Sequence, residues 1–114
     1  MSEVTHSILL ADALRRAGLF FEHIENEGRR DGKRAGIGRR MGRTKGSFDY
    51  RIYDVPPARP DARCVALELK DTAGRLSPEQ VSWAERFRER GGLTLVARGV
   101  DDALKQLRAL GYAV

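Results

Sequence analysis

The chain has 114 residues, of which 41% are hydrophobic and 32% charged, and its formal net charge is +5. This balance is typical of a globular protein rather than a disordered or membrane one, and we expect residues 1–114 to form a single domain with its own core. No apolar run approaches the roughly 20 residues that cross a bilayer, and the N-terminus does not resemble a secretion signal. We therefore expect a cytoplasmic protein with no membrane partner.

The first elements in chain order are a helix and a strand. Thr5–Ala17 has apolar residues near helical spacing, with Arg15 and Arg16 in its last turn and Gly18 beyond it, which predicts an amphipathic helix. Its apolar positions are Ile8, Leu9, Ala13, Leu14 and Ala17. Leu19–Ile24 is short, apolar and aromatic, which predicts a strand.

Six glycines lie among basic residues between Asn26 and Gly46. This is too many for a stable helix or strand, so we predict a long loop. Two strands are expected after it, at Ser47–Tyr53, where apolar and polar residues alternate, and at Arg63–Lys70. Three prolines separate these strands.

The last part of the chain predicts a helix, a strand and a helix. Ser77 is a helix cap, Pro78 stands at the first helical position, and Gln80 completes a capping box. This helix is expected to run to about Arg90 with an apolar face formed by Val81, Trp83, Ala84 and Phe87. Leu93–Ala97 then predicts a strand, and a helix begins at Asp101 with apolar positions at Ala103, Leu104, Leu107 and Leu110. The order α-β-β-β-α-β-α indicates an α/β fold with a mixed central sheet flanked by helices.

The positive charge of the chain is concentrated in one segment. Between Arg29 and Gly46 there are eight basic residues and one acidic residue, a net charge of +7, whereas the rest of the chain has 13 basic and 15 acidic residues. Such a segment is typical of a protein that binds phosphates of a polyanion, and a solvated loop with no ligand is the alternative. The candidate DNA-binding residues are Asn26, Arg29, Arg30, Lys33, Arg34, Arg39, Arg40, Arg43 and Lys45.

Two kinds of site are excluded by composition and pattern. Cys64 is the single cysteine and the chain has only two histidines, so a structural zinc site is not expected and any metal must be held by oxygen. The spacing of Gly36, Gly38 and Gly42 has no strand leading directly into it and no helix after it, which argues against a nucleotide-binding loop. We therefore expect no nucleotide cofactor.

Three charged residues near the predicted sheet suggest chemistry. Strand alternation places Glu68 and Lys70 on one face, and Asp49 belongs to the neighbouring predicted strand. If these strands pair, the two carboxylates can bind one divalent cation, Mg²⁺ or Mn²⁺, beside the lysine. That arrangement suits phosphodiester hydrolysis, while an ordinary ion pair with Asp49 in a turn is the alternative.

These residues lie within a longer pattern that resembles a known family. The pattern comprises Asn26, Gly28, Arg29 and Arg30, the glycine-spaced basic loop, Gly46–Asp49 (GSFD), Leu67–Lys70 (LELK), and Gly74–Gln80 (GRLSPEQ) with Trp83. From about Leu19 to Tyr112 the chain resembles the virus-type replication-repair nuclease (VRR-NUC) domains, in particular standalone phage-type members of the PD-(D/E)XK superfamily. The resemblance implies a restriction-endonuclease-like core.

The resemblance also implies site residues. The acidic pair and lysine of the family correspond to Asp49, Glu68 and Lys70, with Asp49 and Glu68 as metal ligands, and its helix-borne glutamine corresponds to Gln80. A glutamate on the first helix of the family has Glu3 as a weak counterpart, with Glu22 and Glu25 as alternatives. Phe48 stands where the family usually has proline, which suits a strand and removes no chemical group.

Two other residues have simpler interpretations. Trp83 is expected in the core, and His23 is expected as a packed or edge residue rather than a catalytic base. Gln80 has a sufficient structural role in the capping box, so its catalytic role depends on the resemblance.

We thus expect a metal-dependent endodeoxyribonuclease of a bacterial or phage-infected cell that acts on branched or otherwise structured DNA. Cutting both strands of a junction requires two active sites, so a homodimer is expected, held by exposed apolar residues of the helices. One rival is a non-catalytic nucleic-acid-binding module that uses the basic loop. Another is an accessory interaction protein of a phage or prophage.

Overall fold

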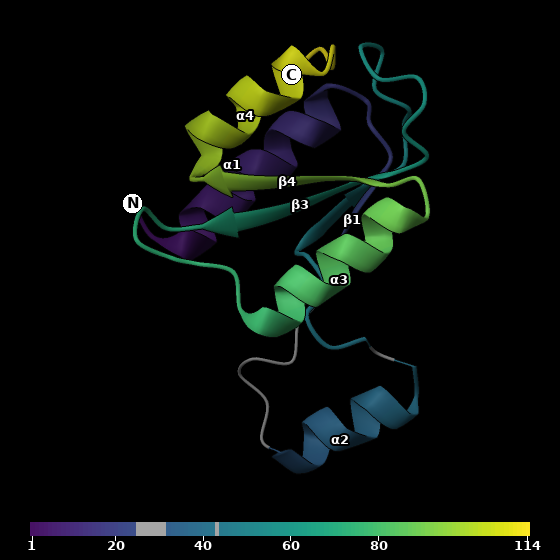
Figure 1. Ribbon diagram of the computed structural model, residues 1–114. Helices are drawn as coiled ribbons and strands as arrows, with labels where there is room; N and C mark the ends of the chain where they lie inside the picture. The colour runs from purple at the N-terminus through teal and green to yellow at the C-terminus, as the bar shows by residue number, and fades with distance from the viewer. Residues whose placement is uncertain (25–31, 43) are drawn as a thin grey trace.

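The computed structural model describes residues 1–24, 32–42 and 44–114, with only the backbone described for residues 32–35. Its elements are four helices and four strands in the order α1–β1–α2–β2–β3–α3–β4–α4 (Figure 1). Their bounds are α1 Glu3–Arg16, β1 Phe21–His23, α2 Gly32–Arg40, β2 Tyr50–Ile52, β3 Val65–Lys70, α3 Pro78–Glu89, β4 Leu93–Arg98 and α4 Val100–Ala109. No helix among these residues is long and apolar enough to span a membrane.

The four strands form one mixed sheet in the order β1-β2-β3-β4. The pairs β1–β2 and β2–β3 are antiparallel, whereas β3 and β4 are parallel. A parallel pair needs a crossover between its strands, and α3 provides it. The expected mixed sheet with flanking helices is therefore confirmed.

Helices cover both faces of the sheet, and side-chain alternation in β3 decides which residues face which helices. Val65, Leu67 and Leu69 lie in the larger core cluster with residues of α1 and α4. Ala66 lies in the smaller cluster, which includes Trp83 of α3. The predicted alternation of β3 is confirmed, and it places Glu68 on the face that α3 covers.

The expectation of an unbroken loop over Asn26–Gly46 is wrong, because α2 occupies Gly32–Arg40. Its glycines weaken a helix, but the lysine, arginine, alanine and isoleucine among them tolerate helical backbone. The N–H of Gly42 continues this bonding to the Arg39 carbonyl, and the positive φ of Gly42, 110°, ends it. Figure 1 shows α2 standing apart from the sheet and the other helices.

The apolar faces of two helices differ from the prediction. In α1 the buried residues are Leu10, Ala13 and Leu14, whereas Ile8 and Leu9 are 55% and 40% exposed. In α3 the side chain of Gln80 is buried and Val81 is 43% exposed. Spacing alone does not fix the rotation of a helix about its own axis. In each helix a residue next to a predicted apolar position is therefore buried in its place. The predicted core positions Trp83 of α3 and Leu107 of α4 are confirmed.

The smaller core cluster is an aromatic stack beside Asp49. Phe48 is fully buried, and its ring lies 5.1 Å from that of Trp83, which in turn lies 4.8 Å from Phe87. The Arg51 guanidinium covers the Trp83 ring at 4.2 Å and donates hydrogen bonds to the Phe48 carbonyl and to Ser47 Oγ. The segment that leads to Asp49 is thereby held against α3.

We expect Phe48→Ala to lower the free energy of unfolding by about 3–5 kcal/mol, because it leaves a cavity under Trp83. Urea unfolding followed by tryptophan fluorescence would measure this loss. Val55→Ala is the control, since Val55 is 52% exposed and should change stability by less than about 0.5 kcal/mol. Equal effects of the two substitutions would show that the aromatic stack contributes nothing special.

Candidate active site

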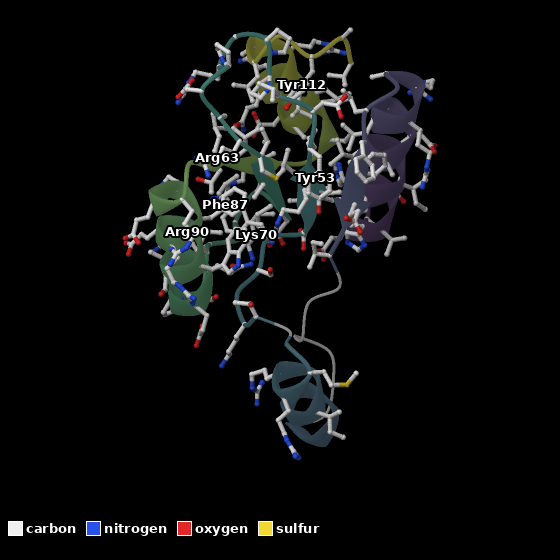
Figure 2. The ribbon with its side chains drawn as sticks, turned by 90° about the vertical axis from the view of Figure 1, so that its right-hand side faces the viewer. Tyr53, Arg63, Lys70, Phe87, Arg90 and Tyr112 are labelled. Carbon is white, nitrogen blue, oxygen red and sulfur yellow. The ribbon has the colours of Figure 1, made fainter. Side chains whose placement is uncertain are left out.

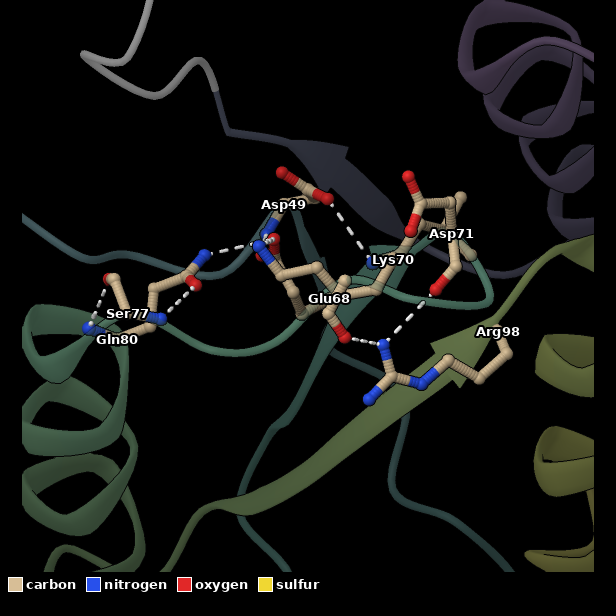
Figure 3. Close-up of polar contacts among 9 residues, drawn as sticks. Asp49, Glu68, Lys70, Asp71, Ser77, Gln80 and Arg98 are labelled. Carbon is tan, nitrogen blue, oxygen red and sulfur yellow. Dashed lines mark hydrogen bonds and ion pairs between the residues drawn. The ribbon is translucent and has the colours of Figure 1, made fainter.

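The register of β2 and β3 brings the two candidate acidic residues together. Tyr50 pairs with Leu67, so Asp49, one residue before β2, lies beside Glu68. The backbone N–H of Asp49 donates to Glu68 Oε1 at 3.1 Å, and the N–H of Leu69 donates to Asp49 Oδ2 at 3.2 Å. Each carboxylate is thus held by a backbone N–H of the opposite segment (Figure 3).

Glu68 is the centre of this group. Its side chain is only 3% exposed, and its Oε2 atom accepts a hydrogen bond from Gln80 Nε2 at 2.9 Å and lies 3.3 Å from Lys70 Nζ. A buried carboxylate is unfavourable unless it has such partners. Figure 3 shows Gln80 reaching Glu68 from α3 and Lys70 lying near Glu68 at the end of β3.

Gln80 has the predicted capping role and a second one. Its side-chain Oε1 accepts from the Ser77 N–H at 3.0 Å, while its backbone N–H donates to Ser77 Oγ at 3.1 Å. The capping box uses the amide oxygen, so the amide NH₂ is directed at Glu68. The N-terminal cap of α3 therefore also orients a carboxylate of β3.

Gly46 permits the close approach of two segments at this place. It has a φ of +85°, and a Cβ there would overlap the backbone of Glu79 and Gln80. Only glycine satisfies both conditions. The first residue of the GSFD motif therefore allows the segment before Asp49 to pack on the first turn of α3.

Burial controls the electrostatics of the two carboxyls. Burial raises the pKa of Asp49, and the Leu69 N–H and the Lys70 charge partly oppose that effect. The pKa of Glu68 is raised by burial first and by the charge of Asp49 next, with Lys70 and Gln80 opposing. Two carboxyls with raised pKa values at one place are typical of functional sites.

Glu3 lies near this group. It lines, together with Lys70, His6 and Arg98, a cavity of about 290 Å³, and its charge is among the influences that raise the pKa of Asp49. The alternative Glu22 instead accepts a hydrogen bond from the Tyr53 hydroxyl at 2.9 Å on β1. The other alternative, Glu25, lies outside the described residues. The structure thus favours Glu3 by position.

The candidate DNA-binding residues lie only partly within the described part of the chain. Arg39 and Arg40 are exposed at the end of α2, and Lys45 forms an exposed ion pair with Glu79 at 3.5 Å. Of Lys33 and Arg34 only the helical backbone is described, and Asn26, Arg29, Arg30 and Arg43 lie outside the described residues. His23 is exposed on the edge strand β1 with its ring 4.9 Å from Tyr50, as expected of an edge residue.

Sequence reasoning missed Arg51 and Arg98 around this site, and it included Gly46 only as part of the GSFD motif. Arg98 pairs in register with Lys70, and its guanidinium donates to the carbonyls of Asp71 and Gly74 (Figure 3). It therefore fixes the loop that follows Lys70. The signal for Arg51 was its alternation with the apolar residues Tyr50 and Ile52, which places it on the Asp49 face.

Comparison with known proteins identifies the fold. No protein-family model and no curated protein matches the chain. A solved structure described as a VRR_NUC domain protein matches with a TM-score of 0.79 and 19% identity, covering 99% of this chain and 88% of that one. A second, described as a VRR_NUC domain, matches with a TM-score of 0.59 and 20% identity over 97% of this chain and 95% of that one. The chain therefore has the VRR-NUC fold, as its sequence resemblance predicts.

We expect Asp49→Asn to stabilise the protein at neutral pH. The raised pKa means that ionised Asp49 is less favourable in the folded than in the unfolded chain, while asparagine keeps an oxygen for the Leu69 N–H. Below the ordinary pKa of 3.8 the carboxyl is protonated in both states, so the advantage of asparagine should vanish there and grow as the pH rises through the raised pKa.

Urea unfolding of both proteins in EDTA across this pH range measures the difference. Asp54→Asn is the control, because Asp54 accepts a backbone hydrogen bond from the Phe20 N–H but lies outside the site. A variant Asp49→Asn that is less stable than the parent at neutral pH would contradict the assignment.

Proposed function

We propose that the protein is a metal-dependent endonuclease that hydrolyses phosphodiester bonds of branched or otherwise structured DNA. The observation that carries this proposal is the meeting of Asp49 and Glu68 across β2 and β3, with Lys70 3.3 Å from Glu68. The likeness of the fold to VRR_NUC domains supports a nuclease, and the sequence resemblance assigns the acidic pair and the lysine to these three residues.

The residues present fit a divalent cation such as Mg²⁺ or Mn²⁺. Asp49 and Glu68 offer carboxylate oxygens of like charge. The described residues contain no group of three or more acidic, histidine or cysteine side chains that could hold a metal ion, so these two carboxylates would be the protein ligands. Mg²⁺ is typically held by one or two carboxylates while water and substrate phosphates complete its coordination. When bound, such an ion polarises the phosphate and lowers the pKa of water.

The side chains of this chain supply the rest of the chemistry. Hydrolysis forms a bond from a water oxygen to phosphorus and breaks the bond from phosphorus to a sugar oxygen, which then takes up a proton. Lys70 presents a positive charge where negative charge develops on the phosphate. Gln80 fixes the orientation of Glu68, and Glu3 is placed to act through water at the edge of the site.

DNA binding is assigned to the basic segment. Arg39 and Arg40 are exposed on α2, which stands apart from the sheet, so they can contact phosphates without displacing core contacts (Figure 1). The remaining basic residues of the segment are proposed to contribute in the same way. Such contacts position DNA without reading its sequence, which agrees with selection of substrates by shape.

We also propose that the protein acts as a homodimer, because cleavage of both strands at a junction needs two sites. Val4 and Ile8 are 62% and 55% exposed and lie four residues apart on α1, so they share one face of that helix. This face is the proposed contact. Light scattering of the protein and of Ile8→Glu tests it, and a monomer in both cases would exclude it.

The decisive experiment incubates the protein with labelled four-way junction, flap, single-stranded and linear duplex DNA in Mg²⁺, Mn²⁺ or EDTA. We expect cleavage of branched DNA in the two metals and none in EDTA. Asp49→Ala and Glu68→Ala should each lower cleavage by about 100-fold or more while DNA binding persists. Binding without cleavage under all conditions would instead indicate a non-catalytic nucleic-acid-binding module.

The two roles of Gln80 can be separated by a matched pair of variants. Ser77→Ala removes the cap and should cost about 1 kcal/mol of stability, but it leaves the amide that reaches Glu68. Gln80→Ala removes the amide and should lower cleavage by about 10–100-fold. Unfolding and cleavage are measured for both. If Ser77→Ala lowers cleavage as much as Gln80→Ala, then Gln80 acts only through the helix.

If the basic segment contacts phosphates, its contribution should be measurable in the salt dependence of DNA affinity. Neutralising Arg39, Arg40 and Arg43 together should lower the slope of log affinity against log salt by about two to three units if all three contact phosphates. Fluorescence anisotropy of a junction in Ca²⁺ measures the slope. The control neutralises three exposed arginines outside the segment, namely Arg59, Arg90 and Arg108. Equal slopes for the segment variant and the parent would show that DNA binds elsewhere.

A further inference from the structure

Two aromatic side chains form an exposed pair at the end of the β1–β2 strand pair where β1 begins and β2 ends. Phe20 is 65% exposed and Tyr53 is 38% exposed, and their ring centroids lie 5.0 Å apart. The Tyr53 hydroxyl donates to Glu22 at 2.9 Å, and the Tyr53 N–H donates to the Phe20 carbonyl at 2.9 Å. The pair is therefore held in place although it is open to solvent.

This aromatic pair lies on the same face of the sheet as the carboxylates. Tyr50 and Ile52 belong to the larger core cluster, whereas Arg51 between them lies over Trp83 of α3. Alternation then places Tyr53 on the face of Arg51, Asp49 and Glu68, together with its neighbour Phe20. Figure 2 shows Tyr53 on the sheet, to one side of Phe87 of α3.

The position of α3 leaves this part of the face open. The smaller core cluster that α3 covers includes Ala66 of β3 and Val96 of β4, and no residue of β1. Tyr53 lies four positions after Asp49, which is a distance of about 13 Å along an extended chain. A DNA strand held at Asp49 and Glu68 can therefore reach the aromatic pair without leaving the sheet face.

The chemistry of the pair favours bases over phosphates. Glu22 faces the same surface and would repel a phosphate, whereas the flat faces of the two rings attract a base by stacking. Stacking on aromatic rings tolerates any base sequence, and it requires that the base be unpaired. A flap or a single-stranded tail next to a duplex offers such bases.

We propose that Phe20 and Tyr53 form a stacking platform for unpaired bases of the DNA strand that is bound at the carboxylates. The proposal rests on the proposed nuclease function, which it extends from a phosphodiester to its neighbouring unpaired nucleotides. It assigns the preference for structured DNA to this pair and the phosphate affinity to the basic segment.

The test compares binding of three probes in Ca²⁺ by fluorescence anisotropy: a duplex with a single-stranded thymidine tail, the same duplex with an abasic tail, and the blunt duplex. The parent should prefer thymidine over abasic tails by about tenfold. Phe20→Leu keeps an apolar side chain but loses the ring, and should bring this ratio close to one without changing the salt slope. Tyr53→Phe keeps the ring and should behave as the parent. So should the control Val81→Ala on α3, where Val81 is an exposed apolar residue (43%).

Any of three results would overturn the proposal: equal binding of thymidine and abasic tails by the parent, an unchanged ratio in Phe20→Leu, or dissociation of a dimer by Phe20→Leu in light scattering. The last would assign the pair to contact between two copies of the chain. Cleavage of the blunt duplex and the four-way junction in Mg²⁺ by the same preparations tests the nuclease function separately. A parent protein that cleaves but binds thymidine and abasic tails equally refutes the platform alone, whereas a parent that prefers thymidine tails but does not cleave refutes the nuclease function alone.

Discussion

The structure depends on the burial of one carboxylate, that of Glu68. In the middle of a sheet face under α3, its oxygens accept from the backbone of Asp49 and from Gln80, and they lie beside Lys70. A carboxylate so placed is tolerated only when each contact is made, because its removal from water is costly. Glu68 therefore links the segment before β2, the strand β3 and the cap of α3, in addition to the aromatic stack that holds the same segment against α3.

This requirement explains features that at first concern only packing. Gly46 lets the chain approach the first turn of α3, and Phe48 stacks on Trp83, so that Asp49 arrives beside Glu68. Phe48 thus has a definite place in the core. Arg51 completes the arrangement by bonding to the Phe48 carbonyl while it covers the Trp83 ring. The packing of these residues therefore also determines the geometry of the site.

Burial of the Asp49 and Glu68 carboxyls is unfavourable for stability, although the proposed reaction needs both groups. Burial raises the pKa of both carboxyls, the charge of Asp49 adds to the rise at Glu68, and the positive charge of Lys70 opposes the rise at both. A fold optimised for stability alone would not place two carboxyls here. A divalent ion would remove the repulsion and bring substrate phosphate to the same point. The divalent ion that we propose would therefore account for the unfavourable placement of both carboxyls.

The sequence by itself determined the strand and helix types over most of the chain and the pairing of faces in β3, because apolar alternation and the Ser77 capping box act locally. It also singled out Asp49, Glu68, Lys70 and Gln80. The prediction of a loop at α2 was wrong, because it gave the glycines more weight than the helical tendency of the other residues. In α1 the prediction placed Ile8 in the apolar face, whereas Leu10 is the buried residue. Only the tertiary structure decided the rotation of α1, and with it the second contact of Gln80, the place of Arg51 and the exposure of Phe20. The physical reason is that helix rotation, strand register and the partners of a buried charge depend on residues far apart in the chain, which local patterns do not specify.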